Sequence, residues 1–223
     1  MKKEAKILLA VLALVVVAGV VGANYYRKSV QSVPVAPAKV AAELVRPDSP
    51  VLGPVDAKVT LVEFYDPECE TCAAYGPIVK TLLKEFDGKV RFVSRYATFH
   101  KNARIAAIYT EAAGEQGKYW EMQAKLFEKQ KEWGEVHGAG PQPAAAAAPS
   151  AKFEQYAKEL GLNVEQLKIS VADPKHGAKI DRDMKDVSSL NVKQTPTFFV
   201  NGRKLARLSQ QDMRTLINEE LAK

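Results

Sequence analysis

The sequence predicts an α/β protein in which a mixed, four-stranded sheet is interrupted by a long helical insertion. Three observations support this prediction. An amphipathic segment lies between two strand-like segments, which is the order of a parallel strand–helix–strand unit. Helical periodicity then dominates from about residue 102 to residue 190. Strand and hairpin signals return only near the C-terminus, before one last amphipathic segment.

The first half of the predicted fold is the strand–helix–strand unit. Residues 59–65 (VTLVEFY) form an apolar run that predicts a buried strand. Apolar residues recur at helical spacing through residues 73–86, and Asp87-Gly88 predicts the end of that helix. Residues 90–96 alternate and predict a second strand parallel to the first.

The insertion and the tail follow from similar patterns. Helices are predicted within residues 102–133 and over residues 153–160, 164–171 and 174–190, with a Pro/Ala-rich surface loop at residues 138–150. In the C-terminal segment, an apolar run predicts a strand at residues 197–200, and Asn201-Gly202 predicts a hairpin turn that leads to a returning strand at residues 204–208. Ser209 predicts the N-cap of a closing helix.

The N-terminus predicts a targeting segment outside the fold. Residues 1–6 are basic, and residues 7–23 are apolar and uncharged, which is short for a membrane span and long for a signal-peptide core. Small residues ending at Ala23 fit a cleavage site, whereas the Tyr25-Tyr26-Arg27-Lys28 run favours an uncleaved anchor. Residues 24–50 then form a Pro-rich linker. Residues 51–223 form one exported domain, with the helical insertion over about residues 99–190.

Composition narrows the class of protein. The net charge of +6 is spread along the chain without a basic run, so the sequence carries no nucleic-acid signature. Cys69 and Cys72 are the only cysteines, so they belong to neither a framework of structural disulfides nor a four-thiolate zinc site. Outside the cytoplasm such a pair can remain oxidised.

The two cysteines form a CxxC motif at the point where the first strand gives way to a helix, which is the setting of a dithiol/disulfide redox centre. Unpaired N–H groups and the helix dipole stabilise a thiolate at a helix N-terminus. We therefore expect Cys69 to be the exposed, attacking sulfur. Cys72, one helical turn later and more buried, is expected to resolve the mixed disulfide.

Two further features of the sequence each allow two interpretations. Glu63 lies in an apolar strand. If it is buried near the cysteines, its pKa is raised and it can take the proton of Cys72. If it faces solvent, it is an ordinary exposed strand residue. Thr195-Pro196 opens the strand at residues 197–200. A cis bond there would expose the Thr195 backbone to an extended substrate, whereas the base rate for prolines favours trans.

Four segments together resemble one family, the DsbA-like thiol-disulfide oxidoreductases, which have a thioredoxin fold with a helical insertion. The matching segments are residues 49–53 (SPVLG), 59–64 (VTLVEF), 69–72 (CETC) and 194–203 (QTPTFFVNGR). The resemblance implies that the Thr195-Pro196 bond is cis and faces the CxxC, and that Glu63 is the buried acid beside Cys72. It implies no dissociable cofactor and no metal, since the Cys69–Cys72 disulfide carries the electrons.

The sequence departs from the family between the cysteines. The strongest oxidants of the family carry Pro-His there, and this chain has Glu70-Thr71. Asp66, Glu68 and Glu70 also place negative charge around the first cysteine. Like charge disfavours a thiolate, so these residues predict a raised pKa for Cys69 and a reduction potential below the oxidant end of the known range.

The sequence and the resemblance together predict an exported thiol-disulfide oxidoreductase on the periplasmic side of a bacterial cell envelope, anchored to the inner membrane by residues 7–23. Its expected partners are extracytoplasmic proteins with cysteine pairs and a redox protein that recycles the CxxC. The direction of electron flow stays open. The alternative is an exported copper-relay or client-binding protein that uses the CxxC as a ligand, for which His100 is the only histidine placed to assist.

Overall fold

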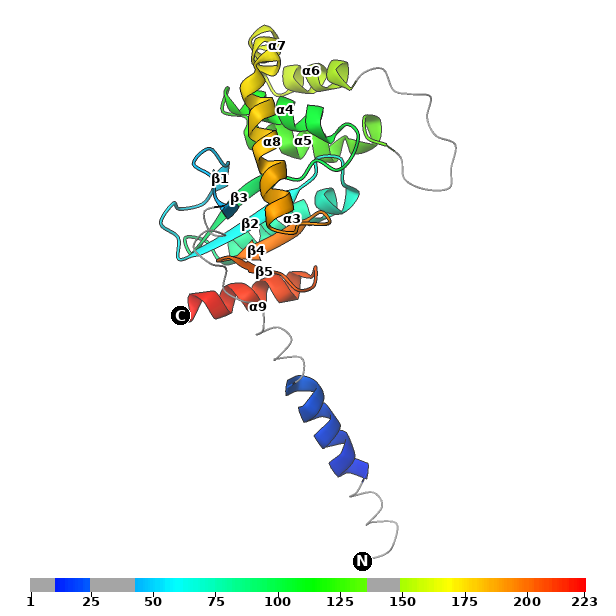
Figure 1. The fold of residues 1–223 in the computed structure, drawn as a ribbon, viewed down its shortest axis with the longest axis vertical. Coiled ribbons are helices and arrows are strands. Elements are labelled where there is room, and N and C mark those ends of the chain that lie inside the picture. The colour runs from blue at the N-terminus through cyan, green and yellow to red at the C-terminus, as the bar shows by residue number, and fades with distance from the viewer. Residues whose placement is uncertain (1–10, 25–42, 136–148) are drawn as a thin grey trace, which may run out of the picture. The chain divides into compact units, whose positions relative to one another are not determined.

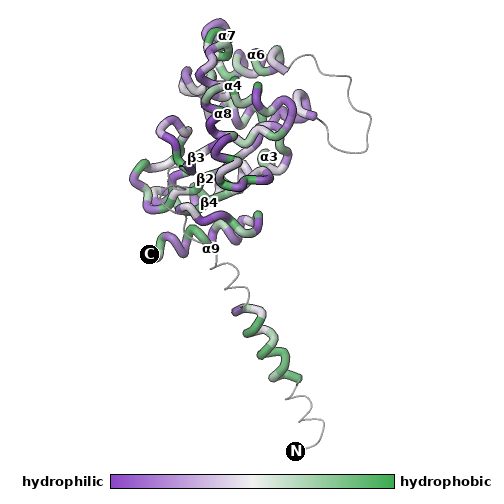
Figure 2. The backbone as a smooth tube through the Cα atoms, viewed as in Figure 1, coloured by the Kyte–Doolittle hydropathy of each residue, from purple (hydrophilic) through white to green (hydrophobic). Residues whose placement is uncertain are grey.

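The computed structural model describes residues 11–24, 43–135 and 149–223, and the chain divides into two compact units, Met1–Val35 and Ala36–Lys223. Within the first unit, residues 11–24 form a helix of exposed, mostly apolar residues (Figure 2). Across the described ranges, none of the helices has the length and apolar character needed to span a bilayer. The predicted start of the anchor, most of the predicted linker and nearly all of the Pro/Ala loop lie outside the described residues.

The second unit is built on a mixed sheet that has five strands in the described residues, in the order β1-β3-β2-β4-β5 (Figure 1). The strands are β1 (Val51–Leu52), β2 (Val59–Tyr65), β3 (Val90–Tyr96), β4 (Thr197–Val200) and β5 (Arg203–Lys204). The predicted parallel pairing of β2 with β3 is confirmed, and the other pairs are antiparallel.

Two details of the sheet differ from the prediction. Strand β1 was not predicted, because a two-residue strand has no periodicity and is recognised only by its pairing with β3. Strand β5 ends at Lys204 rather than Leu208: the backbone of Leu205 still bonds to Phe198, but the chain then turns towards the last helix.

The helices occupy the segments with helical periodicity. They are α3 (Glu70–Glu85), α4 (Ala103–Gly114), α5 (Tyr119–Glu128), the 3₁₀ helix η1 (Gln130–Glu132), α6 (Ser150–Glu159), α7 (Val164–Ala172), α8 (Pro174–Ser189) and α9 (Gln210–Leu221). Figure 1 shows α4–α7 grouped beyond the strands, while the long helix α8 runs from that group across the sheet. Sheet and helices together form a thioredoxin-like α/β fold with an inserted helical region.

Strand β2 is covered on both faces, and this determines where its polar residue lies. Leu61 packs with apolar residues of α3 and α9, whereas Val62 and Phe64 pack with Val187 of α8. The whole strand is therefore buried except Thr60, which is half-buried. Because both faces are buried, Glu63 is buried whichever way it points, so sequence alternation could not distinguish its two interpretations.

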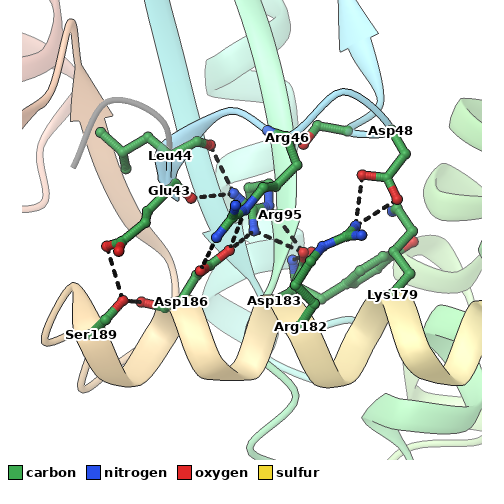
Figure 3. A network of polar contacts seen from close by, with 12 residues as sticks. Glu43, Leu44, Arg46, Asp48, Arg95, Lys179, Arg182, Asp183, Asp186 and Ser189 are labelled. Atoms are coloured by element: carbon green, nitrogen blue, oxygen red, sulfur yellow. Dashed lines mark hydrogen bonds and ion pairs between the residues drawn. The ribbon is translucent and has the colours of Figure 1, made fainter. Parts of the chain in front are cut away.

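A buried polar cluster joins α8 to the sheet and to the segment before β1 (Figure 3). Arg95 of β3 is 1 % exposed and donates to Asp183 and Asp186 of α8. It also donates to the carbonyl oxygens of Glu43 and Leu44. The cluster therefore connects three parts of the chain that are distant in sequence.

Replacing Arg95 with Met should destabilise the protein by about 3 kcal/mol, because Asp183 would remain as a buried charge without its ion-pair partner. The measurement is chemical denaturation of both proteins. Arg182→Met is the matched control. Arg182 lies on α8, the helix that carries Asp183, and pairs with Asp48 at the surface, so its loss should lower the unfolding free energy by less than about 1 kcal/mol. Equal losses in the two variants would contradict the importance of the buried pair.

Candidate active site

The CxxC occupies the turn between β2 and the start of α3. Cys69 is the N-cap residue of α3, in an extended conformation with φ −78° and ψ 119°. Cys69 as a residue retains 8 % exposure, whereas Cys72 in the first turn of the helix is fully buried. Both cysteines are free thiols in this structure. Of the two cysteines, only Cys69 therefore keeps any surface towards solvent.

The loop before β4 lies beside Cys69. Strand β4 runs antiparallel to β2, with Thr197 opposite Phe64, and this pairing brings the preceding residues to the end of β2 from which the CxxC starts. The Cys69 Sγ donates to the carbonyl oxygen of Thr195 at 3.4 Å. The Thr195-Pro196 bond is cis, as the family resemblance implied.

The pKa of Cys69 is lowered to about 5. The largest cause is the hydrogen bond with the Cys72 side chain, which outweighs the opposing effect of burial. The Thr195 side chain and the backbone N–H groups of Cys72 and Thr71 add to the lowering. Donors at the start of a helix thus stabilise the thiolate, as expected from unpaired N–H groups at such a position.

The prediction that nearby acids raise the pKa of Cys69 is wrong, because two of the three acids are turned into the protein. The buried Asp66 carboxylate accepts hydrogen bonds from the backbone N–H groups of Glu68, Phe99 and His100. Glu68 is 1 % exposed and accepts from Asn102 and from the backbone of Glu135. Glu70 alone of the three is exposed to solvent.

His100, which the sequence connected with the CxxC only through the copper-relay alternative, is a neighbour of the site through Asp66. Its Nδ1 lies 2.9 Å from Asp66 Oδ2, and its ring is about a quarter exposed. Burial lowers the pKa of His100, but the hydrogen bond and charge of Asp66, with a contribution from Cys69, raise it overall. Sequence spacing held no signal for this contact, since the loop after β3 meets the CxxC turn only in the folded chain.

The second cysteine and Glu63 form the interior part of the site. Burial, the hydrogen bond to Cys69 and the charge of Glu63 raise the pKa of Cys72 well above its ordinary value. Burial and the charge of Cys69 raise the pKa of Glu63 to about 8. Glu63 also lines a pocket of about 480 Å³ between α3, α5 and the sheet. The arrangement places a carboxyl group of raised pKa close to a thiol that must lose its proton.

Metal ligands are not gathered at this site. Within residues 11–24, 43–135 and 149–223, no group of three or more His, Cys, Asp and Glu side chains is arranged to hold a metal ion. His100 is engaged with Asp66, and His176 of α8 lies within 2.9 Å of Ser170. His137 lies outside the described residues.

The fold, the CxxC at a helix N-terminus and the neighbouring cis-proline loop are the arrangement of a thioredoxin-like protein. A family model described as thioredoxin matches residues 46–219, which is most of the chain. The chain therefore belongs to the thioredoxin family.

Solved structures agree with this assignment. A thioredoxin-like oxidoreductase from Silicibacter pomeroyi is 25 % identical, with a TM-score of 0.67 over 84 % of this chain and 99 % of that one. BdbD from Bacillus subtilis is 27 % identical, with a TM-score of 0.66 over 78 % of this chain and 94 % of that one.

A relative with higher sequence identity is named as an ion antiporter rather than as an oxidoreductase. A protein of Salinispora arenicola named Na(+)/H(+) antiporter NhaA 1 is 36 % identical over 157 residues, which cover 69 % of this chain. The chain spans only 22 % of that relative's length. The similarity therefore concerns one part of a longer protein.

Proposed function

We propose that the chain exchanges disulfides with cysteine pairs of proteins outside the cytoplasm, through Cys69 and Cys72. One observation carries the proposal: Cys69 is an accessible thiol of low pKa that lies 3.4 Å from the backbone of Thr195, with Cys72 buried directly behind it. A low pKa makes Cys69 a thiolate at neutral pH, which is the nucleophilic form. The Thr195 backbone is the proposed docking point for the client chain next to its cysteine.

The exchange balances without a dissociable cofactor. With the protein oxidised, a client thiolate attacks Cys69, the Cys69–Cys72 bond breaks and Cys72 leaves as a thiolate. The second client thiolate then attacks the client sulfur of the mixed disulfide, and Cys69 leaves. The client loses two electrons and the CxxC gains them; the reverse sequence reduces a client disulfide. A separate thiol protein must return the CxxC to its starting state.

Glu63 is proposed to exchange the proton of Cys72. A thiol of raised pKa is a poor nucleophile until a base removes its proton. The pKa of Glu63, about 8, lies much nearer to that of a buried thiol than an ordinary carboxyl group does. The neighbouring pocket supplies a path by which the carboxyl group exchanges the proton with solvent.

Export and membrane attachment complete the proposal. The basic start and the apolar run over residues 7–23 support transport across the inner membrane with retention as an anchor on the periplasmic side. The chain is similar to a segment of a protein that is named as an antiporter, and antiporters act in membranes. This similarity supports a location of the chain at a membrane.

Trapping clients is the direct test. With Cys72 replaced by Ser, Cys69 can form a mixed disulfide that no second thiol of the protein resolves, so adducts with envelope proteins should accumulate on non-reducing gels. Cys69→Ser is the matched control and should trap nothing. The proposal is wrong if both variants give the same pattern. Stoichiometric Cu(I) retention without any disulfide exchange would instead support the copper-relay alternative.

A further inference from the structure

A second, smaller pocket lies next to Thr195, the proposed docking point, and its lining carries positive charge. Its volume is about 190 Å³, and its lining includes Pro196, Gln194, Asn191, Lys193 and Lys204. At about 30 Å³ for each water molecule, this is room for one side chain rather than for a folded segment. The pocket therefore has the size of a subsite for a single residue.

Two lysines border this pocket without acidic partners. Lys193 is exposed in the segment just before Thr195. Lys204, on β5, pairs with Phe199 in the sheet, and its Nζ donates to the carbonyl oxygen of Asn191 at 2.9 Å. Within the described parts of the chain, neither lysine has a carboxylate within ion-pair distance, and the Lys204 ammonium group has two further donors.

The two positive charges act on each other. Burial, followed by the charge of Lys193, lowers the pKa of Lys204. A carboxylate placed between the two ammonium groups would relieve this repulsion. It would also accept hydrogen bonds from the N–H groups of Lys204 that have no partner within the described residues of the protein. The half-buried position of Lys204 makes such an ion pair stronger than one at the open surface.

We propose that this pocket is a specificity subsite that receives an acidic side chain of the client, close in sequence to the cysteine attacked at Cys69. The inference rests on the proposed function, since it places the client strand along Thr195. Lys193 is two residues from Thr195, so an extended client at about 3.3 Å per residue reaches the pocket within roughly three positions of its cysteine. Lys193 and Lys204 would then bind the client without taking part in the bond changes.

The test uses synthetic peptides with one cysteine, activated as a mixed disulfide with nitrothiobenzoate. The Cys69 thiolate of the reduced full-length protein attacks the peptide sulfur and releases nitrothiobenzoate, whose absorbance gives the rate; Cys72 then displaces the peptide thiol. Each peptide carries Glu or Gln at one of the three positions on either side of the cysteine. At the best position, the Glu peptide should react about fivefold faster than its Gln twin at low salt, and the gap should shrink at high salt.

Charge reversal separates the subsite from a general charge effect. In the Lys193→Glu/Lys204→Glu double variant, the Gln peptide should become the faster of the pair. Lys84→Glu changes the net charge in the same direction at an exposed site near the far end of α3, roughly 20 Å from Cys69 at 1.5 Å per residue, and should keep the preference for Glu. Because each ratio compares two peptides on one protein, differences in folding between variants cancel.

The two proposals fail in different ways. If the wild-type protein releases nitrothiobenzoate no faster than Cys69→Ser does, the proposed function is wrong. If all peptides react readily and Glu and Gln twins differ by less than about twofold at every position, the exchange function stands and the acidic subsite is wrong. A preference for Glu that survives in the double variant also overturns the subsite.

Discussion

Alkylation of reduced Cys69 should reach its half-maximal rate near pH 5, because only the thiolate reacts and the pKa of Cys69 is lowered to about 5 from an ordinary 9.0. Cys72 should stay unmodified in the folded protein at that pH, since it is fully buried and its pKa is raised. The measurement is the rate of iodoacetamide labelling against pH, with the modified cysteine identified by mass spectrometry. A half-maximal rate near pH 8 or above would contradict the proposed stabilisation of the thiolate.

Two replacements of Cys72 provide matched controls. The hydrogen bond with Cys72 is the largest cause of the lowered pKa of Cys69. Cys72→Ala removes that donor and should raise the pKa of Cys69 by about one unit or more, whereas Cys72→Ser keeps a hydroxyl donor and should change it less. Labelling profiles in both variants that match the wild-type profile would show that the helix N-terminus, rather than the second thiol, stabilises the charge.

The same pKa determines how redox state affects stability. The folded pKa of Cys69 lies below the unfolded value, so the thiolate stabilises the reduced protein fully above about pH 9, and this contribution is lost as the pH falls towards 5. The oxidised protein has no such thiolate. The stability of the reduced form relative to the oxidised form should therefore decrease over that range. The sequence predicted a potential below the oxidant end of the range because it predicted a raised pKa for Cys69, and the lowered pKa removes that reason. Near neutral pH the reduction potential of the Cys69–Cys72 pair should instead lie nearer ~−120 mV than ~−270 mV, as glutathione equilibration would measure.

Replacing Glu63 with Gln should raise the free energy of unfolding relative to the wild type as the pH rises from about 4.5 to 8, and should slow one step of the exchange. Burial raises the pKa of Glu63 to about 8 from 4.5, so ionising it costs stability as the pH rises through that range. The gain in unfolding free energy of the variant over the wild type should grow by on the order of 4 kcal/mol between about pH 4.5 and pH 8, at about 1.4 kcal/mol per pKa unit. Denaturation of both reduced proteins across this range measures the difference.

The kinetic effect of Glu63→Gln should be confined to Cys72. Without the base, resolution of a preformed Cys69–peptide disulfide should slow by about 100-fold, while the first attack by Cys69 stays close to the wild-type rate. Glu128→Gln is the control, because Glu128 is an exposed carboxylate that lines the same pocket. If both steps slow equally in Glu63→Gln, the carboxyl group acts on the structure of the site rather than on the proton of Cys72.

Much of the fold could be predicted because it depends on local patterns. Strands β2 and β3 are continuous apolar or alternating runs, and the structure has them at the predicted residues. The helices of the insertion have clear apolar stripes, and the cap of α9 by Ser209 was predicted from the residue type. The register that brings Thr195 to Cys69 was available only through family resemblance, because pairing between distant strands leaves no trace in local periodicity.

The sequence by itself determined the two sulfurs, their order on a strand-to-helix turn and the class of chemistry that follows. Only the tertiary structure decided the electrostatics of that site. Asp66 and Glu68 count as negative charges in the sequence, yet in the fold they accept N–H groups from the loop after β3 and beyond. An acid influences a thiol according to its hydrogen-bond partners and its burial, and both depend on segments that meet only when the chain is folded.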